Sequence, residues 1–445
     1  MKQFNVYVTA KDTDERLKCY KLQNFITDQE KSSVNSVKMD TRKKYQKILG
    51  FGGALTEASA YALSKIDENQ QKKVLESYYH KEKGIGYNFA RVHINSCDFS
   101  LENYSYVEDG DMTLDTFTLD RDEKYVLPLV RTVKEMTNND LSILASPWSP
   151  PSYMKTNGEM NNGGKLREDC KQLWADYFVK YINKMKDKDI DVWAVTVQNE
   201  PAAHQVWDSC LYTAEEERDF LKDYLGPTMH KNGLDDKKIV IWDHNRDIVY
   251  ERAKTVLEDK EAAKYIWGTG IHWYVSEEFS NTTKVHDEFP DKHIIFTEGC
   301  QEGGVKLGSW DTGERYGRNI IGDLNNYIEA WMDWNIVLDE TGGPNHVNNL
   351  CDAPVIIDSK TKEIHYNSSF FYIAHFSKFI KNTVRINSDV IGDKIYAIGC
   401  LNEDNTLCAV IMNEENEDKY INLQIDDESV TVKLKAHSIY TIVEE

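Results

Sequence analysis

Short apolar runs alternate with longer amphipathic stretches through most of the chain. The apolar runs are Ile48–Leu55, Tyr87–Ile94, Ser142–Trp148, Val192–Gln198, Lys238–Trp242, Tyr265–Tyr274, His293–Thr297 and Trp331–Leu338. The clearest stretches with helical spacing are Asp67–Tyr79, Leu166–Met185, Ala214–Leu225, Asn319–Ala330 and Ser368–Ile380, with Thr213 as the expected N-cap of the third. Eight strand-then-helix units predict an α/β fold, a closed parallel (β/α)8 TIM barrel, over residues 45–381.

Both ends of the chain have a different rhythm, in which short strands follow one another directly. The C-terminal strands are expected at Val384–Ile386, Lys394–Ile398, Thr406–Met412, Lys419–Gln424, Ser429–Leu434 and Ser438–Ile442. Met1–Leu22 resembles a strand pair, because Phe4, Val6 and Val8 alternate with more polar residues. We therefore expect residues 382–445 to form a small antiparallel β-sandwich domain, which residues 1–44 join to cover their edges.

An open doubly wound sheet is the alternative to the barrel. Such a sheet usually carries a glycine-rich phosphate loop after its first strand, and Gly50-Phe51-Gly52-Gly53 does not match that pattern. The sequence therefore favours the closed barrel and implies no cofactor.

Charge and composition narrow the classes of partner. A formal net charge of −21 repels polyphosphates, which argues against nucleic acid as a partner. No stretch is long and apolar enough to predict a membrane span, and Met1–Leu17 lacks the apolar core of a signal peptide. The eight cysteines include no C-x-x-C pair, so we expect free thiols and a cytoplasmic location. No pattern indicates an oligomeric state.

Two carboxylates follow apolar runs that should lie on opposite sides of the barrel. Glu200 follows the fourth run and Glu298 follows the seventh. Catalytic groups of such barrels come from the carboxyl ends of the strands, so both side chains should emerge on one face. Cleavage of a glycosidic bond needs two carboxyl groups, one to protonate the leaving oxygen and one to meet the developing positive charge on the sugar.

Other residues at or just beyond the ends of the runs suit a sugar site. They are Arg91, Asp98, Trp148, His272, Trp273, Tyr274, Trp334 and Asn335. The chain has 25 Tyr and 10 Trp, and such rings can stack on the apolar faces of sugars.

With these residues in view, the chain resembles glycoside hydrolase family 30, in particular its glucosylceramidase-like branch. The matching segments occur in family order: Gly50–Glu57, Ala90–Val92, Ser96–Ser100, Ala145–Trp148, Lys155–Gly158, Gln198–Pro201, His272–Tyr274, Thr297–Gly299, Asp333–Asn335, Gly342–Asn345 and His375–Ile380. The resemblance spans residues 45 to 381 and implies a retaining glycoside hydrolase.

The resemblance also implies roles for individual residues. Glu200 would be the acid/base and Glu298 the nucleophile. Asn199 would bind the 2-hydroxyl of the sugar, Tyr274 would hold the nucleophile, and Arg91 would lower its pKa.

Further residues would bind the substrate directly: Asp98, Trp148, Trp334 and Asn349 at the terminal sugar, His272 beside them, and Trp207 near the leaving group. The chain departs from the animal glucosylceramidases in two loops. Residues 202–210 form a shorter loop, and His346 stands where those enzymes have a Trp.

The implied mechanism makes demands on the two carboxyl groups. Glu200 must hold a proton at the start, so we expect its pKa to be raised by burial and by the charge of Glu298. Glu298 must be ionised, with Arg91 and Tyr274 as the reasons. A bell-shaped pH profile with an acidic to neutral optimum follows.

The residues argue against two other functional classes and leave several substrates open. A metal-dependent hydrolase needs clustered ligands, and only Asp243-His244 offers two together, so no metal is expected. A non-catalytic sugar-binding protein is disfavoured because both Glu residues and their expected partners are present. The leading prediction is an exo-acting β-glucosidase on a small β-glycoside or oligosaccharide. An endo-β-1,6-glucanase, or a β-xylosidase of the same family, is the alternative.

Overall fold

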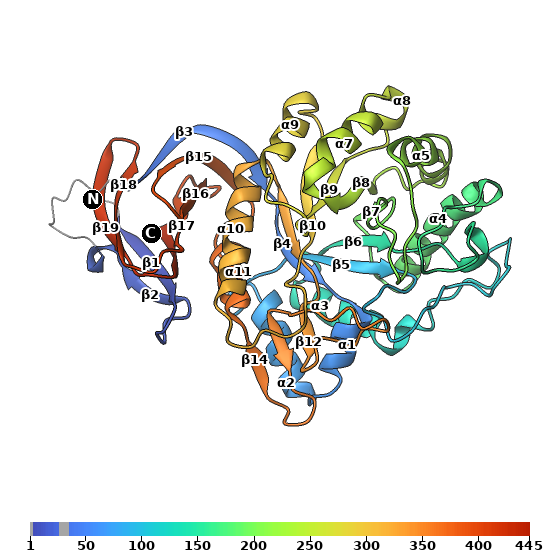
Figure 1. Ribbon diagram of the computed structural model, residues 1–445, viewed down its shortest axis with the longest axis horizontal. Coiled ribbons are helices and arrows are strands. Elements are labelled where there is room, and N and C mark those ends of the chain that lie inside the picture. The colour runs from blue at the N-terminus through green and yellow to red at the C-terminus, as the bar shows by residue number, and fades with distance from the viewer. Residues whose placement is uncertain (1–2, 26–34) are drawn as a thin grey trace.

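The computed structural model describes residues 3–25 and 35–445, and it contains two bodies side by side (Figure 1). The larger is a closed barrel whose strands neighbour one another in the order β10-β11-β4-β5-β6-β7-β8-β9. The strands are β4 (Gly50–Ala54), β5 (Phe89–Ile94), β6 (Ser142–Pro147), β7 (Ala194–Thr196), β8 (Lys238–Asn245), β9 (Gly268–His272), β10 (His293–Glu298) and β11 (Ala330–Asp333). All pair in parallel, which confirms the predicted (β/α)8 barrel.

Helices surround the barrel, and each buries at least one apolar side chain. They are α1 (Glu57–Leu63), α2 (Glu68–Tyr79), α3 (Val126–Met136), α4 (Lys171–Asp187), α5 (Ala214–Phe220), α6 (Gly226–Lys231), α7 (Val249–Leu257), α8 (Lys260–Ala263), α9 (Ser280–Glu288), α10 (Asp311–Asn325) and α11 (Ser368–Ser377). The expected N-cap of α5 is confirmed, because Thr213 and Glu216 form a reciprocal capping box there. Among the described residues, no helix is both long and apolar enough to cross a lipid bilayer.

The smaller body is one nine-stranded sheet that curves around its own apolar core. Its strand order is β19-β18-β3-β15-β16-β17-β20-β1-β2. The strands are β1 (Phe4–Ala10), β2 (Lys18–Lys21), β3 (Ser36–Ile48), β15 (Thr383–Ile391), β16 (Ile395–Leu401), β17 (Leu407–Asn413), β18 (Lys419–Ile425), β19 (Glu428–Leu434) and β20 (Ser438–Glu444). The N-terminal strands therefore join the C-terminal ones, as predicted. Met1 and Lys2, the first residues of the predicted strand pair, lie outside the described residues.

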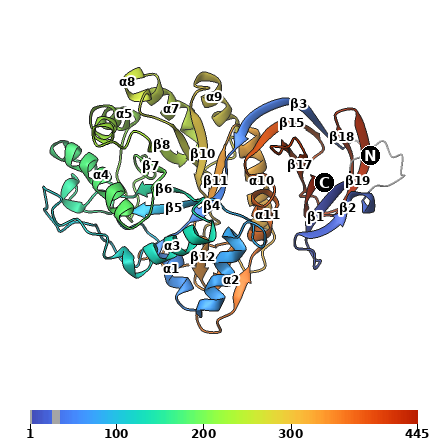
Figure 2. The same cartoon turned by 180° about the vertical axis from the view of Figure 1, so that it is seen from behind.

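The long strands β3 and β15 lie side by side in both views and arch from the small body toward the barrel (Figures 1 and 2). Their pairing shifts register twice between Val384 and Asn387, and such bulges bend a sheet. The bend lets Val37 and Met39 of β3 pack in one core with Val6 and Val8 of β1. The β-sandwich arises from this curvature.

Helices α10 and α11 lie between the two bodies (Figure 1). The buried imidazole of His375, in α11, pairs its two ring nitrogens with the hydroxyls of Thr441 and Thr9, at 2.8 and 2.9 Å. Burial lowers the pKa of His375 to about 3, so the ring joins helix and sheet as a neutral group. This part of the family-like segment His375–Ile380 is structural.

Several helices and strands begin or end at residues other than those predicted. The run Trp331–Leu338 is two strands, because the chain leaves the barrel after Asp333 and forms a separate sheet of β12 (Val337–Asp339), β13 (Val355–Ile357) and β14 (Ile364–Tyr366). The helix predicted at Asn319–Ala330 is α10, which begins at Asp311 and ends at Asn325. The polar first turn of α10 gave no apolar signal for its start. Beyond Asn325, residues 326–329 connect α10 to β11, which begins at Ala330.

Candidate active site

Two carboxylates meet at the carboxyl ends of the barrel strands. Glu298 is the last residue of β10, and Glu200 follows β7 after a short segment. One carboxylate oxygen of each, together with a ring nitrogen of His272, lies within 4.8 Å of the others. Glu200 has a positive φ of 49°, a backbone conformation that residues other than glycine rarely adopt. Its N–H donates to the carbonyl of Asp243 at 3.0 Å. Strained backbone of this kind is often found at functional sites.

Glu298 is held by two donors, Arg91 of β5 and Tyr274 just after β9. The hydroxyl of Tyr274 donates to its Oε1 at 2.8 Å, and the guanidinium of Arg91 donates to its Oε2. Arg91 is fully buried, and its other terminal nitrogen donates to Asp243 at 2.8 Å and to the side-chain oxygen of Asn199 at 2.9 Å. One arginine therefore fixes the nucleophile candidate and the residue that precedes the other carboxylate.

Glu200 contacts a buried histidine, His272. The Nδ1 of His272 lies 3.1 Å from Glu200 Oε1, and its Nε2 lies 3.0 Å from an oxygen of Asp243. Thr297 donates a further hydrogen bond to that oxygen at 2.6 Å. Burial alone would lower the pKa of His272, but the charge of Glu298, whose Oε1 lies 4.0 Å from Nδ1, and the contacts with Asp243 and Glu200 raise it to about 9. The ring is therefore stabilised as an imidazolium.

Both carboxyl pKa values shift in the direction opposite to that expected from the sequence. Desolvation raises the pKa of Glu200, but His244 and His272 outweigh it and lower the pKa to about 2. Desolvation raises the pKa of Glu298, and the opposing effects of His272 and Arg91 do not cancel the rise. We attribute the low pKa of Glu200 to the position of the proton: His272 holds it, and Glu200 accepts a hydrogen bond from that ring. The raised pKa of Glu298 is due to burial.

The same cluster is the group of ligand atoms, among the described residues, that could surround a metal ion. Its one nitrogen ligand would have to be neutral to bind a cation. With a pKa of about 9, His272 is protonated at neutral pH, so the donor set does not suit a metal.

A pocket of about 310 Å³ opens over the two carboxylates. One side, which we call the Asp98 side, contains Asp98, Trp148, Trp334 and Asn349. The two indole rings stack with centroids 5.1 Å apart. The amides of Asn345 and Asn349 donate to one oxygen of Asp98 at 3.1 and 3.0 Å, and desolvation raises the pKa of Asp98 to about 7.

The rest of the lining, which we call the Trp207 side, is more exposed, although Trp207 itself packs against the cluster that contains Trp148 and Trp334. It contains Gln205, Trp207, His244 and Val275, and it borders Glu200. Val275 exposes 64% of its surface, against 4% for Asp98. His346, which departs from the animal glucosylceramidases, does not line the pocket.

The structure brings the predicted site residues together. Nine of them line the pocket: Asp98, Trp148, Asn199, Glu200, Trp207, Tyr274, Glu298, Trp334 and Asn349. Arg91 and His272 lie behind the carboxylates, so His272 contacts Glu200 rather than the pocket space. Sequence reasoning missed Asp243 as a partner of Arg91 and His272, although a carboxylate directly after the apolar run Lys238–Trp242 was a usable signal.

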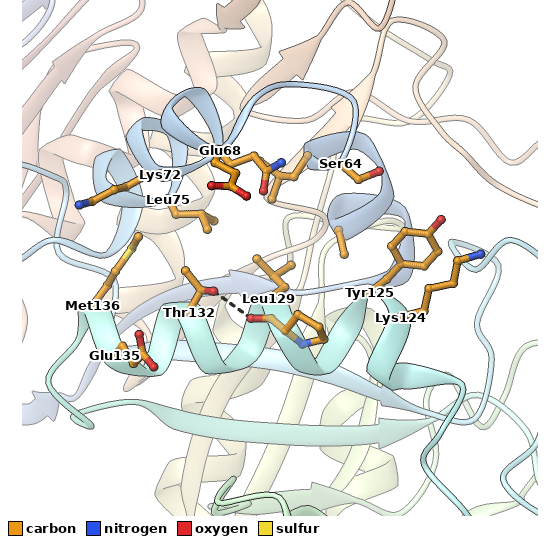
Figure 3. Close-up of a pocket in the computed structure, with 14 residues that line it drawn as sticks. Ser64, Glu68, Lys72, Leu75, Lys124, Tyr125, Leu129, Thr132, Glu135 and Met136 are labelled. Carbon is orange, nitrogen blue, oxygen red and sulfur yellow. Dashed lines mark hydrogen bonds between the residues drawn. The ribbon is translucent and has the colours of Figure 1, made fainter.

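The pocket over the two carboxylates is not the most voluminous hollow in the described structure. A larger hollow of about 610 Å³ lies between α1, α2 and α3, with Leu75 and Leu129 facing each other across it (Figure 3). Lys72, Lys124, Glu68 and Glu135 lie around it, and the Thr132 hydroxyl in its wall is already bonded to the carbonyl of Pro128. Among the described residues that line this hollow, the two carboxylates, Glu68 and Glu135, lie on separate helices, and neither follows a barrel strand.

Comparison with known proteins agrees with the geometry. The glycosyl hydrolase family 30 TIM-barrel domain matches residues 48–380, and the beta sandwich domain of the same family matches residues 382–442. The lysosomal acid glucosylceramidase of Mus musculus is 35% identical over 400 residues, which cover 85% of this chain and 77% of the mouse protein.

Two solved structures are similar over nearly their whole length. SrfJ from Salmonella typhimurium has a TM-score of 0.94 and 31% identity, covering 99% of each chain. The endo-beta1,6-glucanase BT3312 has a TM-score of 0.88 and 26% identity, also covering 99% of each chain. The chain therefore belongs to glycosyl hydrolase family 30 and is a glycoside hydrolase.

Proposed function

We propose that this glycoside hydrolase is an exo-acting β-glucosidase, similar to glucosylceramidases, that works with retention of configuration. One observation carries the proposal: a pocket of about 310 Å³ over two carboxylates that approach within 4.8 Å. Retaining enzymes hold these groups about 5–5.5 Å apart, whereas inverting enzymes need about 6.5–9.5 Å. The volume is at the low end for small-molecule sites, about 300–1,000 Å³, which supports binding of a single terminal sugar.

In the first step, Glu298 attacks the anomeric carbon and the bond to the leaving oxygen breaks. Arg91 and Tyr274 orient the attacking carboxylate through their bonds to its two oxygens. Glu200 delivers a proton to the leaving oxygen. Because His272 holds that proton within hydrogen-bond distance of Glu200, it can pass from Nδ1 to Oε1 as negative charge develops on the leaving group.

In the second step, water replaces the leaving group. Glu200 accepts a proton from this water, and the water oxygen attacks the anomeric carbon of the glycosyl–Glu298 ester. The C–O bond to Glu298 breaks, the sugar departs with its original configuration, and the shared proton returns to the Glu200–His272 pair.

The Asp98 side would bind the terminal glucose. Asp98 can accept hydrogen bonds from two neighbouring hydroxyls, and the stacked Trp148 and Trp334 offer an apolar wall. Asn349 supports Asp98. Asn199, which Arg91 orients, is the candidate partner of the 2-hydroxyl.

An endo-β-1,6-glucanase is the second candidate. The similarity to the endo-beta1,6-glucanase BT3312 favours it. So does the open Trp207 side, where Val206 and Val275 expose 62% and 64% of their surfaces. A polymer would need the pocket to be open beyond the Asp98 side as well, and Asp98, Asn345 and Asn349 fill that end.

The test compares 4-nitrophenyl β-D-glucoside with a β-1,6-linked glucan, with Glu298→Gln as the inactive control. An exo-enzyme releases nitrophenol and only glucose from the glucan ends. Release of oligosaccharides would establish the endo alternative. Cleavage of 4-nitrophenyl β-D-xyloside in preference to the glucoside would reassign the sugar, and no cleavage of any of these substrates would contradict the proposal.

A further inference from the structure

A second histidine, His244, faces the pocket without a hydrogen-bond partner among the residues that the structure describes. It lies in β8, is 8% exposed and lines the pocket on the Trp207 side. Its Nδ1 is buried with no partner, and its Nε2 lies 3.9 Å from Glu200 Oε1, too far for a hydrogen bond. This differs from His272, which uses both ring nitrogens.

The backbone is shaped to present this ring. The pairing of β8 with β9 shifts register between Trp242 and His244, and Trp242 and Asp243 both have positive φ values, of 69° and 50°. Neighbouring strand residues normally point to opposite faces. The bulge instead lets Asp243 reach Arg91 and His272 while His244 lines the pocket. Bulges beside active sites commonly re-aim a side chain in this way.

The protonation of His244 follows from its surroundings. Burial lowers its pKa, and the nearby charge of Glu200 does not reverse this, so the ring is neutral at neutral pH. A buried N–H without an acceptor is less tolerable than a buried acceptor without a donor. The proton therefore belongs on Nε2, the nitrogen nearer to Glu200, and leaves His244 with one donor.

The leaving group is the ligand that this donor can reach. Glu200 must contact the leaving oxygen to protonate it. Because Glu200 Oε1 and His244 Nε2 are 3.9 Å apart, one oxygen atom can lie within hydrogen-bond distance of both. Atoms next to the leaving oxygen are also within reach of Nε2, whereas the terminal sugar would bind at Asp98, Trp148 and Trp334.

We propose that His244 is a specificity-determining residue whose Nε2–H donates a hydrogen bond to a hydroxyl oxygen of the leaving group, next to the oxygen that Glu200 protonates. The inference rests on the proposed function and names its substrate class. The preferred substrates are β-glucosides whose leaving group is itself a polyhydroxylated alcohol, such as a second sugar. Nitrophenol has no hydroxyl at that position and does not use this contact.

The experiment measures one ratio, kcat/KM for a β-1,6-linked glucose disaccharide divided by kcat/KM for 4-nitrophenyl β-D-glucoside. His244→Phe keeps a ring but removes the donor, and His244→Gln restores an amide N–H at similar reach. His230→Phe is the matched control, because His230 is exposed on α6 and contacts Tyr265 outside the pocket. We expect the ratio to fall about 10-fold in His244→Phe, to recover most of that loss in His244→Gln, and to stay at the wild-type value in His230→Phe.

A second measurement follows only the second chemical step, in which the glycosyl-enzyme is released. The enzyme is trapped with a 2-deoxy-2-fluoro-β-D-glucosyl fluoride, and added glucose is used as the acceptor that reactivates it. Because the acceptor occupies the place of the leaving group, glucose should accelerate reactivation less in His244→Phe than in wild type.

An unchanged ratio and unchanged acceleration by glucose in His244→Phe would overturn the role of His244 while the proposed function stands. If the wild type cleaves neither substrate and is not trapped, the proposed function fails and the inference fails with it. A ratio that falls equally in His244→Phe and His244→Gln would show that shape rather than the hydrogen bond matters, which also contradicts the proposal.

Discussion

The two sides of the pocket are built in different ways. On the Asp98 side, Asp98, Trp148 and Trp334 are at most 4% exposed, and the polar groups are fixed by other protein groups. On the Trp207 side, Val275 is 64% exposed, and the polar group His244 has no hydrogen-bond partner. The polar groups of the Asp98 side are therefore held in place before substrate binds. On the Trp207 side, the ring of His244 would gain its hydrogen-bond partner from the bound substrate.

This difference explains how one catalytic arrangement can serve several substrates. Hydrogen bonds and ion pairs fix the two carboxylates to Arg91 and His272 at the ends of the barrel strands. We expect a substitution at any of these four residues to lower catalytic activity. The Trp207 side comes from the loop after β7 and from the bulged end of β8, where a substitution leaves the core intact. Related enzymes named as glucosylceramidases and glucanases are therefore compatible with one site plan.

The largest effect is expected at the centre, where both sides meet. Glu298→Gln removes the nucleophile, so kcat should fall by at least about 10⁴-fold on every substrate. Glu302→Gln is the matched control, because Glu302 also lines the pocket but pairs with Arg315 and exposes 45% of its side chain. Comparable losses in both variants, measured with 4-nitrophenyl β-D-glucoside, would argue against a special role for Glu298.

The next effect should depend on the leaving group. Glu200→Gln cannot protonate the leaving oxygen, so cleavage of a disaccharide should fall about 10²–10⁴-fold. Nitrophenol leaves readily without a proton, so the first step on its glucoside should suffer less. Burst kinetics with the two substrates check this, and equal losses on both would mean that Glu200 does not act as the acid.

A change on the Asp98 side should affect all substrates alike. Asp98→Asn removes the acceptor for the sugar hydroxyls and places an amide against Asn345 and Asn349, so we expect kcat/KM to fall about 10²-fold for any β-glucoside. Steady-state kinetics with at least two leaving groups test this. A loss that varied with the leaving group would break the distinction between the two sides.

The pH profile tests the proton held between Glu200 and His272. Activity needs Glu298 ionised, so it is lost as pH falls through the raised pKa of Glu298. It also needs the proton of the pair, which is lost as pH rises through the pKa of His272, about 9.

In His272→Gln, the proton resides on Glu200 alone and is lost at lower pH, and Glu298 loses a neighbouring cation. Both limbs should therefore move inward, the alkaline one by more than about one pH unit. A profile of kcat/KM with both limbs at their wild-type positions would contradict the shared proton.

The smallest effect is expected on the Trp207 side. Trp207→Ala removes a half-buried ring from the wall near the leaving group. We expect kcat/KM to fall about 3- to 10-fold, with a different ratio between aryl and sugar leaving groups. A uniform loss above 10²-fold, with circular dichroism unchanged, would place Trp207 with the preorganised residues instead.

The sequence predicted the barrel because its pattern is set by local periodicity, and it predicted Glu200 and Glu298 because catalytic side chains follow apolar runs. It did not predict the proton position. That depends on His272 standing between Glu200 and Asp243, which are 43 residues apart in sequence and meet only in the closed barrel. The orientation of the His244 side chain toward the pocket depends on a bulge in β8, which the spacing of apolar residues does not predict.

The most direct test of the central claim is covalent trapping with 2-deoxy-2-fluoro-β-D-glucosyl fluoride, followed by peptide mass spectrometry. The fluorine at the 2-position slows both steps, and the activated leaving group lets the glycosyl-enzyme form and accumulate. We predict one fluoroglucosyl group per chain, attached to the peptide that carries Glu298, and none in Glu298→Gln. Label on Glu200, or the absence of any covalent adduct in an enzyme that turns over β-glucosides, would contradict the account.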